Sequence, residues 1–146
     1  MQRTLITAIA LLAPLAAGAA TPVVVCGGIG SDERHAMQAQ ATNANVSLEF
    51  FVGKRGAYVA DVELTFTPAK GLPSYSTNAD GPLCFARLDP GTYRVEATYR
   101  GATRVATAQV GESGAPVHLA MGFPESVAQP DPAPISAEEK RQASEP

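Results

Sequence analysis

The sequence predicts an all-β sandwich of about seven strands, preceded by one short helix. Three observations lead to this prediction. Most of the chain alternates apolar and polar residues with the period of a half-buried strand, turn residues interrupt the alternation at short intervals, and only one segment is rich in helix formers. Short strands of this kind bury their apolar faces by packing one sheet on another. The 146 residues leave room for one such domain.

The first twenty residues have the layout of a secretory signal peptide. Arg3 precedes an apolar run from Leu5 to Leu15, and small residues fill positions 17–19. The run of about eleven residues is too short to cross a hydrocarbon core of roughly 30 Å, although a membrane anchor is the alternative interpretation. We therefore expect cleavage near Ala19 or Ala20 and a periplasmic or secreted protein without stable membrane insertion.

The expected elements follow in order along the rest of the chain. The β-branched segment 21–26 could form a short edge strand. A helix is expected over Asp32–Gln40, with Ser31 as its N-cap and two acidic residues in its first turn. Alternation then predicts strands at 46–53, 58–67, 83–88, 93–100, 103–110 and 117–121. The second of these strands has the clearest alternation. Its expected buried face consists of Tyr58, Ala60, Val62, Leu64 and Phe66.

Loops and chain ends complete the expected organisation. The segment from Pro68 to Pro82 predicts a long loop with room for a short strand near Tyr75. Pro90 and Gly91 predict a type II turn, because glycine supplies the positive φ that its third position needs. The expected domains are a signal peptide at 1–20, a lead-in with the helix at 21–45, the sandwich at 46–123 and a disordered Pro/Glu-rich tail at 124–146. The expected core comprises Val46, Leu48, Phe50, Val62, Leu64, Phe66, Leu88, Tyr93, Val95 and Leu119.

Cys26 and Cys84 are the only two cysteines. An exported chain matures where disulfides persist, and an even count suggests one bridge. That bridge would close a loop of about 59 residues and contribute on the order of 4 kcal/mol in the chain-entropy model. Two buried free thiols are the alternative. Lipidation of Cys26 is disfavoured, because the preceding residues Val23–Val25 are not the small residues that a lipoprotein peptidase reads.

Charge and residue spacing exclude several kinds of partner. From Ala20 to Phe123, eight basic and nine acidic side chains give a net charge of 8 − 9 = −1. Such a domain has no basic patch for nucleic acid and no polybasic stretch for anionic lipid. The chain also has no C-x-x-C spacing and no paired histidines. We therefore expect no nucleic acid, no metal and no cofactor.

The residues that could carry chemistry are few and scattered. His35 is expected on the helix and His118 on the solvent side of the last strand, each without a partner at catalytic spacing. Asp61 and Glu63 are expected on the outward face of one strand, where acids more often pair with cross-strand arginines than perform acid–base catalysis. We therefore expect no catalytic residues and no enzyme activity.

A motif in residues 81–97 is similar to that of a known family. Leu88, Pro90, Gly91 and Tyr93 match the pattern Leu-x-Pro-Gly-x-Tyr, which lies between two strands and resembles the signature of carboxypeptidase regulatory-like domains. The resemblance covers roughly residues 46–121, and the lead-in is similar to that of small exported Gram-negative proteins that carry this domain alone. The resemblance implies a transthyretin-like, or prealbumin-like, Greek-key sandwich. It implies no peptidase activity, because the zinc-binding domain of metallocarboxypeptidases has no counterpart in these residues.

These observations favour a non-catalytic interaction module that binds an envelope protein or a glycan. A sheet edge or the long loop at 68–82 is the expected recognition surface, since loops on a rigid scaffold often carry binding residues. Its candidate residues are Tyr75, Ser76, Asn78 and Asp80. A carbohydrate-binding module is the alternative, because the resemblance and the tyrosines both allow it. A transthyretin-like hydrolase ranks last, because the chain lacks the C-terminal Tyr-Arg-Gly-Ser of those enzymes.

Overall fold

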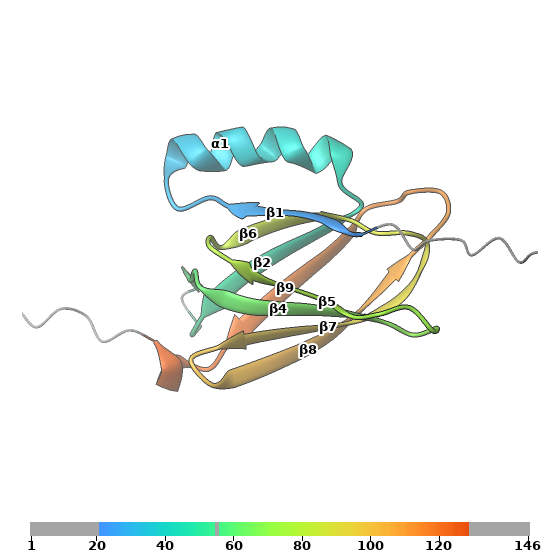
Figure 1. The fold of residues 1–146 in the computed structure, drawn as a ribbon. Coiled ribbons are helices and arrows are strands. Elements are labelled where there is room, and N and C mark those ends of the chain that lie inside the picture. Colours follow the sequence, from blue (N-terminus) through green and yellow to red (C-terminus); the bar gives the residue numbers. More distant parts are fainter. Residues whose placement is uncertain (1–20, 55, 129–146) are drawn as a thin grey trace, which may run out of the picture.

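Two sheets pack face to face in the computed structural model, which describes residues 21–54 and 56–128 (Figure 1). The first sheet consists of β1 (Val23–Gly27), β6 (Leu83–Arg87), β2 (Val46–Val52), β9 (Val117–Phe123) and the short β3 (Ala57–Tyr58). The second consists, in spatial order, of β5 (Tyr75–Ala79), β4 (Val62–Pro68), β7 (Gly91–Tyr99) and β8 (Ala102–Val110). The all-β sandwich is therefore confirmed, with nine strands among the described residues in place of about seven.

Strand β2 lies in the middle of the first sheet. It pairs antiparallel with β6 and parallel with β9, so that Val46 lies opposite both Ala86 and Val117. The other strand pairs of the described residues are antiparallel. A parallel pair between strands so distant in sequence joins the end of the described chain to the centre of the sheet.

The sandwich is closed along one side and open along the other. On the closed side β8 and β9 lie close together, and the Arg104 Nε donates a hydrogen bond of 2.7 Å to the Gly122 carbonyl. On the open side, β1 and β5 are the edge strands, and each pairs with a single neighbour. Within residues 21–54 and 56–128, one backbone edge of each of these strands has no partner strand.

The core lies between the two sheets. All the predicted core residues except Leu119 are buried, and Leu119 is half-buried against the same core. The prediction missed the aromatic end of the core, where the ring centroids of Tyr99 and Phe123 lie 5.5 Å apart. These two residues terminate strands, where a sequence pattern has few neighbours left to establish its period.

The expected strand at 58–67 is wrong in its first part. The chain forms β3, leaves the first sheet, and enters the second sheet as β4. Asp61 takes a left-handed conformation (φ 57°) at this crossing. The break inverts the expected alternation, so that Val59 is buried (8% exposed) whereas Tyr58 is half exposed (51%). The alternation of a strand in the sequence does not reveal a single residue with a left-handed conformation. Aspartate tolerates this conformation better than most residues do.

The expected long loop at 68–82 contains strand β5. Five residues of β5 pair with β4, from Tyr75 opposite Phe66 to Ala79 opposite Val62. The hydroxyls of Thr65 and Ser76 lie 2.9 Å apart across this pair. Apart from its tyrosine and threonine, β5 consists of residues that seldom favour strands, so its partner strand rather than its own composition determines its conformation.

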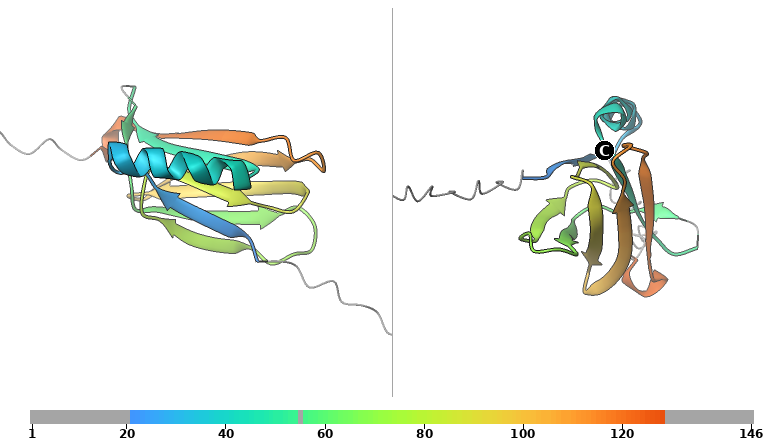
Figure 2. Two further views of the ribbon diagram at one scale, coloured as in Figure 1. Left: turned by 90° about the horizontal axis from the view of Figure 1, so that it is seen from above. Right: turned by 90° about the vertical axis from the view of Figure 1, so that its right-hand side faces the viewer.

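Helix α1 (Ser31–Gln40) lies outside the sandwich beside β1 (Figure 2). Its N-cap is Gly30, not the expected Ser31, and no side chain caps it. Instead the Glu33 carboxylate turns back and accepts a hydrogen bond of 3.0 Å from the Ile29 N–H, which satisfies a backbone donor ahead of the helix. Met37 is the one buried side chain of the helix. No helix among residues 21–54 and 56–128 is long and apolar enough to cross a membrane.

A disulfide joins Cys26 of β1 to Cys84 of β6. The two residues lie directly opposite each other in the pairing of these strands, and Cys84 is fully buried. The expected bridge is therefore confirmed, and the expected edge strand at 21–26 is the edge of the first sheet.

The two ends of the chain are described only in part. The expected signal peptide and residues 129–146 of the expected tail lie outside the described residues. The first residues of the expected tail are described: residues 125–127 form a short 3-10 helix, and Val127 and Ala128 pack against the core.

The family-like motif lies at the turn from β6 to β7. Leu88 is buried, and its backbone N–H and C=O both bond to the side chain of Asn45, at 2.9 and 2.7 Å. The Tyr93 hydroxyl donates a hydrogen bond of 2.8 Å to the Asp89 carbonyl. Gly91 has a positive φ of 155°, well beyond the ~80° of the expected type II turn. The turn is thus held by side chains on both flanks.

Candidate functional site

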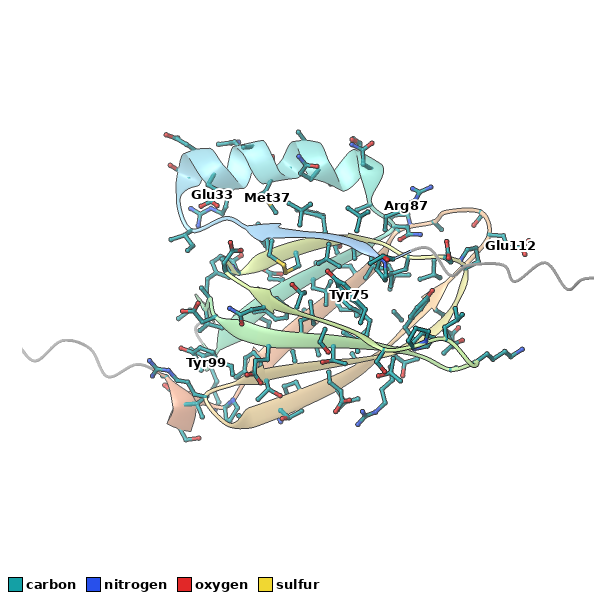
Figure 3. All side chains as sticks on the ribbon, in the orientation of Figure 1. Glu33, Met37, Tyr75, Arg87, Tyr99 and Glu112 are labelled. Atoms are coloured by element: carbon teal, nitrogen blue, oxygen red, sulfur yellow. A yellow bond between two sulfur atoms is a disulfide. The ribbon has the colours of Figure 1, made fainter. Side chains whose placement is uncertain are left out.

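A groove opens at the end of the sandwich where β4 and β6 end and β5 and β7 begin. Its cavity of about 380 Å³ is of the size that binds small ligands or side chains of a partner. We call it the loop-end groove, lined by Thr21, Pro22, Val23, Pro68, Leu72, Pro73, Ser74, Tyr75, Arg87, Leu88, Asp89 and Tyr93. A second hollow of about 310 Å³ adjoins it and shares Pro68, Leu72 and Tyr93. Figure 3 places Tyr75 and Arg87 away from the end of the sandwich that carries Tyr99.

The walls of the loop-end groove are mostly apolar. Val23 of β1 is 64% exposed and Leu72 of the loop before β5 is 44% exposed, although both are large hydrophobic residues. Tyr75 is half-buried and packs against the core from the same side. Arg87 and Asp89 add one charge of each sign. An exposed apolar surface with a few polar groups at its margin is typical of a binding site.

Tyr93 forms a fixed part of the groove wall. Its hydroxyl is held by the Asp89 carbonyl, and the ring is almost fully buried. Burial raises the pKa of the Tyr93 hydroxyl above its ordinary value, and the Asp89 carboxylate adds to the rise. The hydroxyl therefore stays protonated at neutral pH and keeps its donor role in the turn.

The structure separates the four predicted recognition residues onto two faces of β5. Tyr75 lies on the inner face and lines the loop-end groove. Ser76 and Asn78 lie exposed on the outer face, and Asp80 lies exposed just beyond the strand. The four residues do not form one surface, because successive side chains of a strand point to opposite sides. The prediction missed Val23 and Leu72, which no local pattern connects with Tyr75.

A polar cluster that the sequence analysis missed lies on the outer face of the first sheet. Ser47 Oγ and His118 Nδ1 are 2.8 Å apart, and His118 Nε2 lies 3.7 Å from Glu49 Oε2. The other oxygen of Glu49 accepts a hydrogen bond of 2.5 Å from the Tyr58 hydroxyl. The parallel pairing of β2 with β9 produces the cluster, since it places Ser47 opposite His118.

The Ser47–His118–Glu49 cluster contains the residue types of a catalytic triad, but its setting does not suit catalysis. The His118 side chain is 62% exposed, so water reaches the imidazole freely. The hydrogen bond to Glu49 and the charge of that carboxylate raise the pKa of Tyr58, while the nearby Arg34 guanidinium lowers it. We interpret the cluster as a surface hydrogen-bond network, because an activated nucleophile needs a site that positions substrate and excludes water.

The remaining polar candidates do not assemble. Asp61 lies outside β4, so it does not share a strand face with Glu63. Glu63 lies opposite Asn78 and Thr98 instead of an arginine. His35 is exposed on α1. Within residues 21–54 and 56–128, no group of three or more His, Cys, Asp or Glu side chains is placed to hold a metal ion.

Comparison with known proteins does not assign the chain to a family. No family model matches the sequence, and no curated protein matches it with significant similarity. The functional argument therefore depends on the geometry of the molecule itself.

Proposed function

We propose that the chain is an exported, non-catalytic binding module of the carboxypeptidase regulatory-like type, with a transthyretin-like sandwich and a periplasmic or secreted location. The β-sandwich, the Cys26–Cys84 disulfide and the ordered turn around Leu88 and Tyr93 support this proposal. Disulfides persist outside the cytosol, which favours export. In this proposal the loop-end groove binds an extended segment of an envelope protein.

One observation carries the proposal: the loop-end groove lies between two unpaired strand edges. β1 contributes Val23 to the groove and β5 contributes Tyr75, and in the described part of the chain each strand has one backbone edge without a partner strand. An extended peptide can add to such an edge through backbone hydrogen bonds, while every second side chain enters the adjacent groove. Neither strand contains a lysine or a proline, the residues that commonly protect an exposed edge.

The character of the groove indicates which segments would fit. Val23, Leu72 and Tyr75 offer apolar contacts, so apolar side chains at alternate positions of the partner should be preferred. Arg87 and Asp89 can each bind a charge of opposite sign and thereby set the direction in which the segment lies.

We expect the oxidised full-length protein to enrich peptides from a random displayed library, with apolar residues at every second position. Leu72→Asp should weaken an enriched peptide by about tenfold or more, because it introduces a charge into the apolar wall. Val105→Asp is the matched control, since Val105 is also an exposed hydrophobic residue (51%) but lies on β8, on the closed side. Fluorescence anisotropy of a labelled peptide would measure both variants. Equal affinities for the two variants would reject the groove as the binding site.

A further inference from the structure

A further cavity, of about 600 Å³, lies at the other end of the sandwich from the loop-end groove and its adjoining hollow. Its walls come from the start of α1, the β3–β4 crossing and the hairpin between β7 and β8. We call it the hairpin pocket, and the residues that matter here are Arg34, Tyr58, Asp61, Pro82, Tyr99 and Arg100. Its volume is within the range of small-molecule sites.

Backbone strain is concentrated at the hairpin pocket. Asp61 (φ 57°) and Arg100 (φ 47°) are the two non-glycine residues with positive φ among residues 21–54 and 56–128, and both line this pocket. Arg100 and Gly101 form a two-residue hairpin in which both φ angles are positive. The first position of such a turn favours asparagine, aspartate or glycine rather than arginine. The turn alone therefore does not explain the arginine, and strained residues of this kind gather at functional sites.

Two arginines, Arg34 and Arg100, line the pocket. Neither Arg34 nor Arg100 makes an ion pair with a side chain of the described residues. Arg100 lies over the ring of Tyr99, with its guanidinium carbon 5.4 Å from the ring centroid. The Glu49 hydrogen bond raises the pKa of the Tyr58 hydroxyl, and the charge of the nearby Arg34 guanidinium opposes that rise. Asp61 is the one acid of the lining, so the pocket has a net charge of 2 − 1 = +1.

We propose that the hairpin pocket binds a small monocarboxylate that carries an apolar body. The guanidinium groups of Arg34 and Arg100 hold the carboxylate, because the planar fork of arginine matches two carboxylate oxygens. Tyr58 and Pro82 face the apolar body. Asp61 disfavours ligands with a second negative charge. This site is independent of the proposed peptide binding at the loop-end groove.

The carboxylate has two possible sources, a free molecule or the chain itself. Ala128 lines the hairpin pocket, and Asp131 follows three residues later in the sequence. Three residues of extended chain span at most ~10 Å, so Asp131 is the acidic residue to test as a source within the chain. Both sources supply one carboxylate to the two guanidinium groups, and an experiment can separate them.

The test is a titration of the oxidised full-length protein with benzoate, followed by NMR of the arginine Nε–Hε groups and of the Gly28 and Gly101 amides. Benzoate is expected to shift these signals saturably and at least tenfold more tightly than benzamide, which has the same shape without the charge. Arg34→Gln and Arg100→Asn should each weaken benzoate at least tenfold. Arg94→Gln is the matched control, since Arg94 pairs with Glu96 on β7 away from the pocket, and should leave the affinity unchanged.

Arg100→Asn also separates binding from folding. Asparagine suits the left-handed position better than arginine does, so this variant should keep or raise the thermal midpoint while it loses benzoate affinity. If benzoate and benzamide bind alike, or if Arg100→Asn retains full affinity, the proposal is overturned.

The Asp131→Asn variant of the full chain identifies the source of the carboxylate. If the tail occupies the pocket, this substitution should shift the Arg100 signal before any ligand is added and tighten benzoate binding. If a free molecule is the ligand, the spectrum and the affinity should both stay as in the unmodified chain. Both results support a carboxylate site. Absence of benzoate binding in the Asp131→Asn chain would reject it.

Discussion

Loss of the Cys26–Cys84 bridge is expected to lower the free energy of unfolding by about 4 kcal/mol. The two cysteines are separated by 58 residues, so the bridge removes much of the freedom of the unfolded chain. It also holds β1, which among the described strands pairs with β6 alone. Urea denaturation of the oxidised and the reduced protein measures this effect without any change of side chain, and the oxidised protein should unfold at the higher midpoint.

The Cys26→Ala/Cys84→Ala protein is the permanent equivalent of the reduced state. It should unfold near the reduced midpoint, with a small additional loss because the fully buried Cys84 leaves a space in the core. Peptide binding at the loop-end groove should weaken in parallel, since Val23 of β1 forms part of its wall. Coinciding oxidised and reduced midpoints would show that the bridge contributes no stability.

Asn45→Ala is expected to lower the free energy of unfolding by about 3 kcal/mol. The Asn45 side chain is 5% exposed and satisfies both the N–H and the C=O of Leu88. Removal of the amide leaves two polar groups of the backbone without partners in the interior, at about 1–3 kcal/mol each. Thermal and urea denaturation with a two-state fit would measure the loss.

Asn43→Ala is the matched control for this variant. Asn43 is exposed in the short helical turn after α1, and its replacement should change stability by about 0.5 kcal/mol or less. If Asn45→Ala lowers stability as little as Asn43→Ala does, water replaces the amide at Leu88 without loss of stability. The two hydrogen bonds of Asn45 would then not stabilise the turn.

Local patterns predicted the core well because burial and alternation are properties of single strands. Val46, Leu48 and Phe50 follow this rule, and all three are buried. The pattern failed where tertiary pairing overrides local preference. β5 is a strand because β4 supplies its partner, and the left-handed Asp61 moves the chain from one sheet to the other.

Both cavities were beyond the reach of sequence analysis for a related reason. The loop-end groove combines Val23 with Leu72 and Tyr75, and the hairpin pocket combines Arg34 with Asp61 and Arg100. Val23 is far in sequence from Leu72 and Tyr75, as Arg34, Asp61 and Arg100 are from one another, and the strand order brings each set together. Tyr75 was predicted because an aromatic residue in an expected loop indicates a binding residue without any further pattern. Arg100, in contrast, has no sequence feature that distinguishes it from other residues near a hairpin.

The parallel pair of β2 with β9 has a consequence for the order of folding. Val46 meets Val117, 117 − 46 = 71 residues later in the chain. Contacts between such distant residues form slowly, because a long loop must close before the strands can pair. While the chain is still being synthesised and β9 has not yet emerged, β2 has β6 on one side and no partner strand on the other. The first sheet is complete only when β9 pairs with β2, so a chain that lacks β9 stays incompletely folded.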